Sequence, residues 1–116
     1  MTKRLVVGIS GASGVIYGIR MLEALRDLGH ETHLVMSRSA ETTLAIETKR
    51  KVAEVQALAT ATYAVTDVAA ALSSGSFGTD GMVIAPCSIR SLSEIATGVT
   101  SSLLTRAADE IGRAHV

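Results

Sequence analysis

Two kinds of hydrophobic pattern alternate along the chain. Residues 5–9 are continuously apolar, which predicts a strand buried on both faces, as in a parallel sheet covered by helices. After a turn of small residues at 10–14, apolar positions recur every three or four residues with charged residues opposite them. That spacing predicts an amphipathic helix, with Ser13 as its N-cap and Gly29 as its C-terminal stop. The face expected to pack on the sheet contains Val15, Gly18, Ile19, Leu22, Leu25 and Gly29.

The alternation of strand and helix patterns continues through the rest of the chain. Further strands are predicted at residues 31–36, 63–65 and 82–85, the last of them ended by Pro86. The predicted helices cover residues 39–58 with a break around 49–51, 68–72, 91–97 with a stop at Gly98, and 102 onward, and a loop is predicted at 73–78. Strands alternating with helices predict an α/β fold with a doubly wound parallel sheet. Only three or four strands are visible, so one edge of the sheet is expected to be bare.

Composition and charge narrow the class of protein. The chain has 116 residues, of which 47% are hydrophobic and 3% aromatic, so one core built from aliphatic side chains is expected. Eleven basic and eleven acidic residues cancel, which gives no indication of binding to nucleic acid or to an acidic membrane. A single cysteine excludes an internal disulfide. With no apolar run near the roughly 20 residues that span a bilayer, we expect a cytoplasmic protein.

A glycine-rich turn between the first strand and the first helix is the first candidate site. Residues 8–14 have the spacing G-x-x-G-x-x-G, and a helix N-terminus behind such a turn favours phosphate. The spacing is neither the dinucleotide fingerprint nor a Walker A loop, since Val15 stands where lysine is required. The second predicted strand ends in Met36, Ser37 and Arg38 without an acidic residue for a ribose. A mononucleotide is therefore favoured over NAD; the alternative is a capped turn without a ligand.

A second turn, at residues 86–91, is expected at the same edge of the sheet. Its serine hydroxyls, its backbone amides and Arg90 could surround a phosphate or a polar ring. The alternative is an ordinary strand-to-helix turn with Ser88 as a helix cap, and Cys87 is expected to be a small buried residue rather than a nucleophile. Glu47 interrupts an apolar helical stretch and is either a proton relay with a raised pKa or a solvent-facing side chain. The three histidines lack metal-ligand spacing, so no metal site is expected.

Five motifs, taken together, resemble one family. The strings V-G-I-S-G-A-S-G-V-I-Y-G, E-T-H-L-V-M-S, A-I-E-T, I-A-P-C-S-I-R-S-L-S and L-L-T-R-A-A-D occur in this order. In this combination the chain resembles the UbiX-like flavin prenyltransferases, Pad1-like proteins formerly called aromatic acid decarboxylases, over residues 3–110. The resemblance implies a flavodoxin-like or Rossmann-like flavoprotein that binds FMN, uses no metal and assembles into a homo-dodecamer. It also implies transfer of a dimethylallyl group from dimethylallyl phosphate to reduced FMN, giving prenylated FMN for UbiD-type decarboxylases, including those of ubiquinone biosynthesis.

The resemblance also assigns residues. Ser13 and Glu47 are expected to be catalytic, Ser13 near the substrate phosphate and Glu47 in proton transfer. The residues expected to contact FMN are Gly11, Ala12, Ser13, Ser37 on the phosphate side, and Ser88, Ile89, Arg90 and Ser91 along the flavin.

The last residues of the chain depart from the family pattern. After Asp109 the family continues through a basic stretch into another buried strand, whereas residues 110–116 do not match. We therefore expect residues 1–116 to form a single FMN-binding flavoprotein domain that is incomplete at its C-terminus. One alternative is a truncated, non-catalytic FMN-binding fragment. Another is a flavin-dependent cysteine decarboxylase, a branch that carries P-A-S-A-N-T where this chain has P-C-S-I-R-S, and a catalytic histidine near the position of Glu47.

Overall fold

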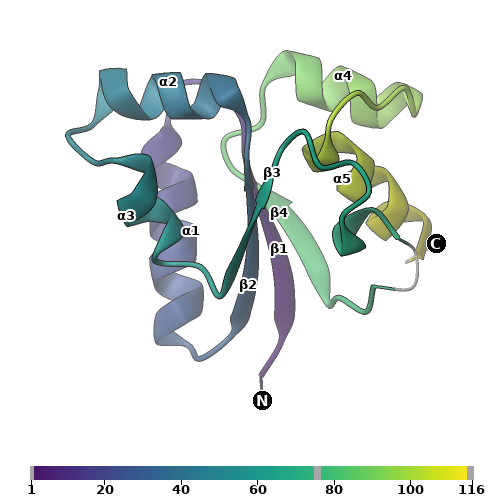
Figure 1. The fold of residues 1–116 in the computed structure, drawn as a ribbon, viewed down its shortest axis with the longest axis horizontal. Helices are drawn as coiled ribbons and strands as arrows, with labels where there is room; N and C mark the ends of the chain where they lie inside the picture. Colours follow the sequence, from purple (N-terminus) through teal and green to yellow (C-terminus); the bar gives the residue numbers. More distant parts are fainter. Residues whose placement is uncertain (1, 75–76, 115–116) are drawn as a thin grey trace.

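A four-stranded parallel sheet forms the centre of the computed structural model, which describes residues 2–74 and 77–114 (Figure 1). Its strand order is β3-β2-β1-β4, and every neighbouring pair is parallel. The strands along the chain are β1 Arg4–Ile9, β2 Glu31–Met36, β3 Ala61–Ala64 and β4 Gly81–Ile84. The chain reverses its direction of winding after β3 and places β4 on the other side of β1. This order confirms the predicted α/β fold with a doubly wound sheet.

Helices cover both faces of the sheet. In Figure 1, α1 (Val15–Asp27), α2 (Arg38–Glu47) and α3 (Val52–Gln56) lie to the left of the strands. The 3-10 helix η1 (Ala71–Ser73) and α5 (Leu103–Ala114) lie to the right. Helix α4, whose bounds are Ile89–Thr97, lies above α5, so α2 and α4 both stand at the carboxyl ends of the strands.

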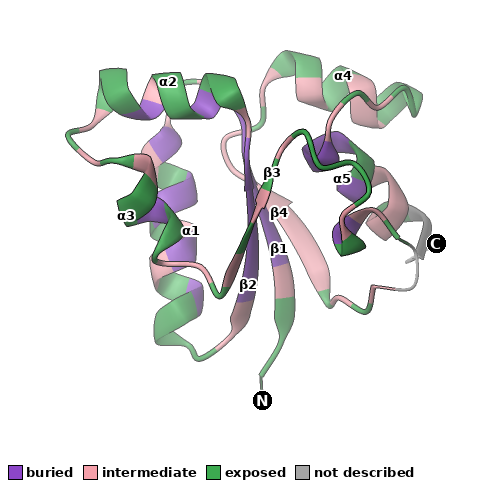
Figure 2. Cartoon of the chain, in the orientation of Figure 1, coloured by how far each residue is buried: buried purple, intermediate pink, exposed green. Residues whose placement is uncertain are grey.

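Each face of the sheet has its own hydrophobic core (Figure 2). On the side of α1 and α2, Val7 and Ile9 of β1 pack with the apolar face of α1. On the side of α5, Val6 packs with Leu103 and Leu104. All five side chains are at most 1% exposed. Alternate residues of β1 thus enter opposite cores, which explains why this strand is apolar without interruption.

The boundaries of several elements differ from the predicted ones. Ser13 does not cap α1; the N-cap is Gly14, in the left-handed conformation with φ of 99°. The strand predicted at 63–65 lies at 61–64, and the helix predicted at 68–72 is only the 3-10 turn η1. The break predicted around 49–51 does separate α2 from α3, and Gly29 and Gly98 have the positive φ expected of helix stops. Residues 75–76 of the predicted loop lie outside the described residues.

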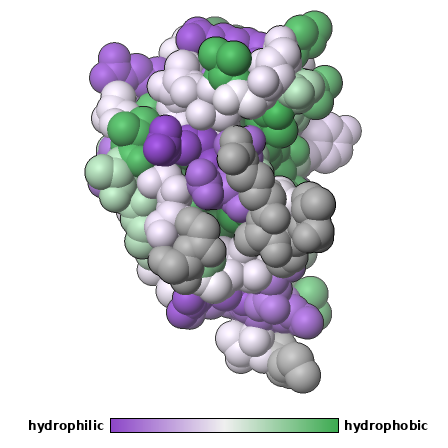
Figure 3. All heavy atoms as spheres, turned by 90° about the vertical axis from the view of Figure 1, so that its right-hand side faces the viewer, coloured by the Kyte–Doolittle hydropathy of each residue, from purple (hydrophilic) through white to green (hydrophobic). Residues whose placement is uncertain are grey.

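The outer strands β3 and β4 each have one edge that pairs with no strand of the described residues. A groove of about 530 Å³ runs beside β4, between α4 and α5, and its walls include Met82, Leu92 and Ile95. Figure 3 looks onto this side of the molecule and shows hydrophobic and hydrophilic surface next to each other. The bare edge predicted from the strand pattern is therefore present at β4.

Within residues 2–74 and 77–114, no helix combines the length and the apolar character needed to cross a bilayer. The cytoplasmic location expected from the sequence stays a prediction.

Close packing between α1 and the β4 end of the sheet generates one stability prediction. A Cβ on Gly18 would lie 2.3 Å from the backbone oxygen of Ala85 and 2.8 Å from Ile9. Because a backbone atom cannot rotate away, Gly18→Ala is expected to destabilise the fold by about 1–3 kcal/mol. A Cβ on Gly112 in α5 would meet nothing within 4 Å, so Gly112→Ala is the matched control and should be neutral or slightly stabilising. Urea unfolding of both variants measures the difference, and equal midpoints would contradict the close approach.

Candidate functional site

A pocket of about 550 Å³ opens at the carboxyl edge of the sheet, between α2 and α4. Its volume lies within the usual range for small-molecule sites, roughly 300–1,000 Å³. Polar side chains and backbone from five separate segments line it. These residues are Gly11, Ser37, Arg38, Ser39, Val65, Thr66, Val68, Ser88, Arg90, Ser91, Glu94, Ser101, Ser102, Leu104 and Thr105.

Ser10 joins the turn that follows β1 to the turn that follows β4. Its side chain is buried, and its hydroxyl donates to the carbonyl oxygen of Pro86 at 2.7 Å. The same oxygen of Ser10 accepts the backbone N–H of Ser88 at 2.6 Å. The Ser10 hydroxyl is therefore used within the protein. It fixes the turn after β4 against the turn after β1 and so sets the width of the pocket floor.

Gly11 and the start of α2 form one wall of the pocket. Ser37 is the N-cap of α2, and its hydroxyl oxygen accepts the N–H of Ala40 at 3.0 Å. A Cβ on Gly11 would lie 2.2 Å from Cβ of Ser39 and 3.1–3.2 Å from the Ser39 backbone. Only glycine allows the turn to approach α2 this closely. The positive end of the α2 dipole consequently faces the pocket next to the glycine turn.

The start of α4 forms the opposite wall. Ser88 is its N-cap, and its hydroxyl oxygen accepts the N–H of Ser91 at 3.1 Å while its O–H donates to Oγ of Ser91 at 3.0 Å. Ile89 is 86% exposed and is not part of the pocket lining. Cys87 is exposed rather than buried, which corrects the sequence interpretation; partial burial still raises the pKa of its thiol, so nothing here activates it as a nucleophile.

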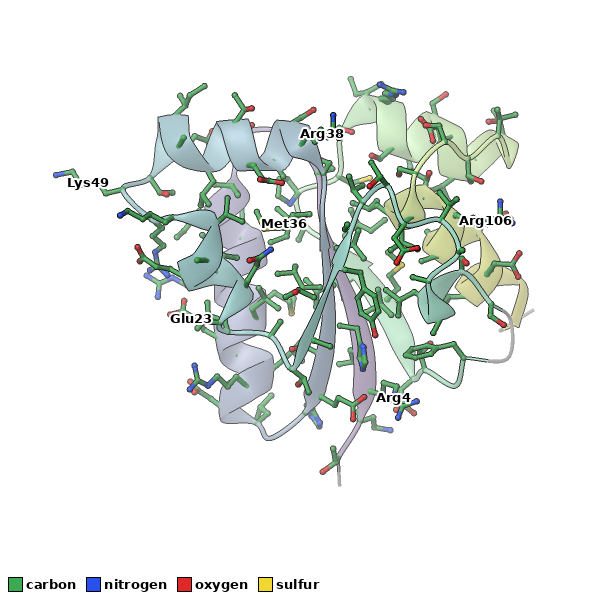
Figure 4. All side chains as sticks on the ribbon, viewed as in Figure 1. Arg4, Glu23, Met36, Arg38, Lys49 and Arg106 are labelled. Atoms are coloured by element: carbon green, nitrogen blue, oxygen red, sulfur yellow. The ribbon has the colours of Figure 1, made fainter. Side chains whose placement is uncertain are left out.

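The chemistry of the lining suits a phosphorylated ligand with a polar ring. The starts of α2, α4 and α5 all contribute to the pocket lining, and Arg38, labelled between α2 and α4 in Figure 4, adds a cation. Serine and threonine hydroxyls supply further donors and acceptors around the walls. The single carboxylate of the lining, Glu94, is paired with Arg90 at 3.1 Å. An anion can therefore enter without meeting an uncompensated negative charge.

Glu47 lies outside this pocket lining and binds the start of α1. Its carboxylate accepts the Ser13 hydroxyl at 2.8 Å, the N–H of Gly14 at 3.0 Å and the N–H of Val15 at 3.2 Å. These bonds, that of Ser13 foremost, lower the pKa of Glu47. Of the two alternatives for Glu47, the raised pKa is wrong, because the carboxylate accepts bonds at a helix N-terminus. The residue is exposed, as the solvent-facing alternative expected. The carboxylate supplies the cap that Ser13 was expected to provide.

The structure thus divides the predicted site residues between two places. Gly11, Ser37, Ser88, Arg90 and Ser91 line the pocket. Ala12, Ser13, Glu47 and Ile89 are absent from that lining, and Ser13 and Glu47 form the pair beside α1. The sequence interpretation missed six polar residues of the lining, namely Ser39, Thr66, Glu94, Ser101, Ser102 and Thr105.

One pattern in the sequence could have indicated two of the missed residues, Ser101 and Ser102. Two adjacent serines, Ser101 and Ser102, directly precede an apolar helical pattern, which is a helix-start signature. No strand precedes them, so nothing in the pattern placed this helix start at the carboxyl edge of the sheet. The backbone bond from Leu103 to the carbonyl of Val65, at 2.8 Å, brings it there. In the part of the chain that the structure describes, no group of three or more candidate ligands could hold a metal ion.

The Glu47 cap generates a pH prediction. The lowered pKa means that ionised Glu47 stabilises the fold above its ordinary value of 4.5 and that this contribution is lost as the pH falls below it. Glu47→Gln is expected to lower Tm at pH 7, with a difference from wild type that shrinks progressively below pH 4.5. Thermal unfolding from pH 7 to pH 3 checks this, with Ser13→Ala in a double-mutant cycle to isolate their bond. A Tm difference that stays constant down to pH 3 would rule out the cap.

Comparison with known proteins matches this architecture to one family. The model of the family described as Flavoprotein matches residues 1–116. Flavin prenyltransferase UbiX of Salmonella typhimurium is 61% identical over 110 residues, which are 94% of this chain and 58% of that protein. A probable UbiX-like flavin prenyltransferase of Bacillus subtilis is 56% identical over 106 residues, 91% of this chain and 52% of that protein. The chain thus spans little more than half the length of these relatives.

Solved structures agree with the sequence relatives. AnUbiX (PadA1), crystallised with FMN and dimethylallyl pyrophosphate, superposes with a TM-score of 0.96 at 44% identity and covers 98% of this chain and 61% of that one. The dodecameric FMN-dependent UbiX-like decarboxylase of Escherichia coli O157:H7 gives 0.94 at 44% identity, covering 97% of this chain and 62% of that one. The resemblance seen in the five sequence motifs is confirmed: this chain belongs to the flavoprotein family, and its similar relatives are UbiX-like flavin prenyltransferases.

Proposed function

We propose that this chain is the FMN-binding part of a flavin prenyltransferase and that FMN occupies the pocket between α2 and α4. One observation carries the proposal: the pocket lies at the carboxyl edge beside the switch in strand order, and the starts of α2, α4 and α5 line it. Open α/β sheets bind nucleotides at this position. The similar structure AnUbiX was solved with FMN, which supports the choice of mononucleotide.

Within the pocket, the two walls suit different parts of FMN. Ser37 and the start of α2, with Arg38 beside them, offer N–H groups and a positive charge and would hold the phosphate. Ser88 and Ser91, with the backbone of the turn after β4, would face the flavin ring, with Arg90 at its rim. Gly11 would let the backbone approach the ligand, as it approaches Ser39 in this structure. Ala12 and Ile89 would contribute backbone contacts only.

We further propose that Ser13 and Glu47 serve the prenyl transfer. Reduced FMN, when bound, would supply the electron-rich ring that captures the dimethylallyl group. The Ser13 hydroxyl and the N–H groups of Gly14 and Val15, which bind Glu47 in this structure, would turn to the phosphate of dimethylallyl phosphate. Its negative charge grows as its allylic C–O bond breaks. The lowered pKa keeps Glu47 ionised near neutral pH but also makes it a weaker base. Glu47 would therefore accept a proton only once the substrate has taken over the donors that lower its pKa.

The remaining parts of the proposal come from the relatives. AnUbiX was crystallised with dimethylallyl pyrophosphate, and the Escherichia coli relative is dodecameric. By analogy we propose a dimethylallyl phosphate substrate, a homo-oligomeric cytoplasmic enzyme, and delivery of prenylated FMN to a UbiD-type decarboxylase. This chain covers 58% of the Salmonella typhimurium relative, so catalysis by the whole protein also depends on the part of the family that these residues do not cover.

Two matched glycine substitutions test the FMN site. Gly11→Ala would force the α2 start away from the turn, because its Cβ would overlap Ser39. We expect its FMN dissociation constant, measured by quenching of flavin fluorescence, to rise at least tenfold, or about 1.4 kcal/mol. Gly112→Ala, whose Cβ meets nothing within 4 Å, should bind like wild type. If folded Gly11→Ala protein binds FMN with unchanged affinity, FMN does not bind in this pocket.

A separate measurement tests the reaction. The protein is incubated without oxygen with reduced FMN and dimethylallyl phosphate, and the extracted flavin is analysed by mass spectrometry. A flavin that has gained the five dimethylallyl carbons supports the prenyltransferase. Bound FMN that stays unmodified would instead favour the non-catalytic FMN-binding fragment, and FMN binding itself would still stand.

A further inference from the structure

We propose that Glu94 is a positioning residue of the pocket, one that holds the loop between α4 and α5 in place as a wall of the FMN site. The proposal rests on the proposed FMN binding and extends it to a residue that acts by holding other parts of the lining in place. Glu94 lies on α4, while the loop it holds, residues 98–102, leads into α5. Both sides of this contact line the same pocket.

The carboxylate of Glu94 binds groups from three successive segments. Its Oε1 accepts the N–H of Ser101 at 2.8 Å, the hydroxyl of Ser101 at 3.0 Å and the hydroxyl of Thr105 at 2.9 Å. Its Oε2 accepts the Ser101 hydroxyl at 2.9 Å and Nε of Arg90 at 3.1 Å. The Glu94 side chain is only 16% exposed. One carboxylate thus connects α4, the loop and α5.

The bonds to the loop dominate the contact. Arg90 is 82% exposed, and ion pairs so close to solvent are weak because water and salt screen them. Ser101 contributes both its backbone N–H and its hydroxyl, and Thr105 is buried. Hydrogen bonds to a charged acceptor are stronger than neutral ones. These bonds, that from the Ser101 backbone foremost, lower the pKa of Glu94 to about 2, so the carboxylate is charged at neutral pH.

Among the described residues, Ser101 forms no hydrogen bond other than those to Glu94. The neighbouring positions have their own anchors: Leu103 donates to the carbonyl of Val65, and Ser102 accepts the N–H of Thr105. Losing the Glu94 carboxylate would therefore release the loop around Ser101 and leave α5 in place. A mobile wall must be ordered again when ligand binds, and that ordering lowers the affinity. Losing Glu94 would also free the Arg90 cation, which would raise the affinity for the FMN phosphate. Because Arg90 is largely exposed, we expect this gain in affinity to be smaller than the loss from the mobile wall.

The test compares FMN binding by Glu94→Ala and Glu94→Gln with a control carboxylate. Glu23→Ala is the control, because Glu23 also pairs with an arginine of its own helix, Arg20, at 3.3 Å on α1 and does not line the pocket. We expect the FMN dissociation constant to rise about tenfold in Glu94→Ala and less in Glu94→Gln, which keeps one acceptor oxygen. Glu23→Ala should bind FMN like wild type.

Two further readouts separate positioning from general stability. Hydrogen exchange of residues 98–102 should be faster in the Glu94 variants without FMN and slow down when FMN binds. The visible absorption band of bound flavin should also shift relative to wild type, since one wall of its pocket has moved. The proposal would be overturned by a Glu94 variant with a lower Tm that still has the wild-type FMN affinity. Such a variant would also keep the wild-type flavin absorption band and the wild-type hydrogen-exchange protection of residues 98–102. If Glu94→Ala does not fold, the same measurements on Glu94→Gln test the positioning role.

The failures of the two proposals are distinguishable. If wild-type protein does not bind FMN, the proposed function fails and this inference fails with it. If wild type binds FMN and the Glu94 variants bind equally well, only the positioning role is lost.

Discussion

The hydrogen bonds of Ser10 are the constraint on which the rest of the site depends. This buried serine directly follows β1 and ties the turn after β4 to it through the carbonyl of Pro86 and the N–H of Ser88. The sheet order puts β4 next to β1 and on the opposite side from β2. The start of α2, which follows β2, and the start of α4, which follows β4, therefore lie on opposite sides of Ser10. The pocket exists because these two strands end on either side of one buried hydroxyl.

Much of the fold could be predicted from the sequence because local patterns determine it. The uninterrupted apolar residues of β1 reflect burial on two faces, and the spacing from Val15 to Leu25 matches the buried face of α1. Short elements were less predictable. β3 alternates between exposed and half-buried positions, and its place at the sheet edge follows from pairing with β2, which no local pattern reveals.

The site was predictable where it follows a strand and was missed where it does not. Gly11, Ser37 and Ser88 lie within four residues after β1, β2 and β4, so their meeting at one edge followed from the topology. Glu94 lies a further turn along α4 and Ser101 lies beyond that helix, and both reach the pocket through the packing of α4 and α5. Glu47 shows a different limit. The sequence marked its importance, but the direction of its pKa depended on which N–H groups it would meet, and those belong to residues more than 30 positions away.

The most direct test of the central claim is an NMR titration of the isotope-labelled chain with FMN, following backbone amides. The account predicts the largest shifts at Gly11, at residues 37–39 and at residues 88–91, on the two walls of the pocket. Amides near the amino ends of the strands, such as those of Glu31 and His33, should not change. Shifts concentrated in the groove beside β4, or spread evenly over the chain, would contradict an FMN site between α2 and α4.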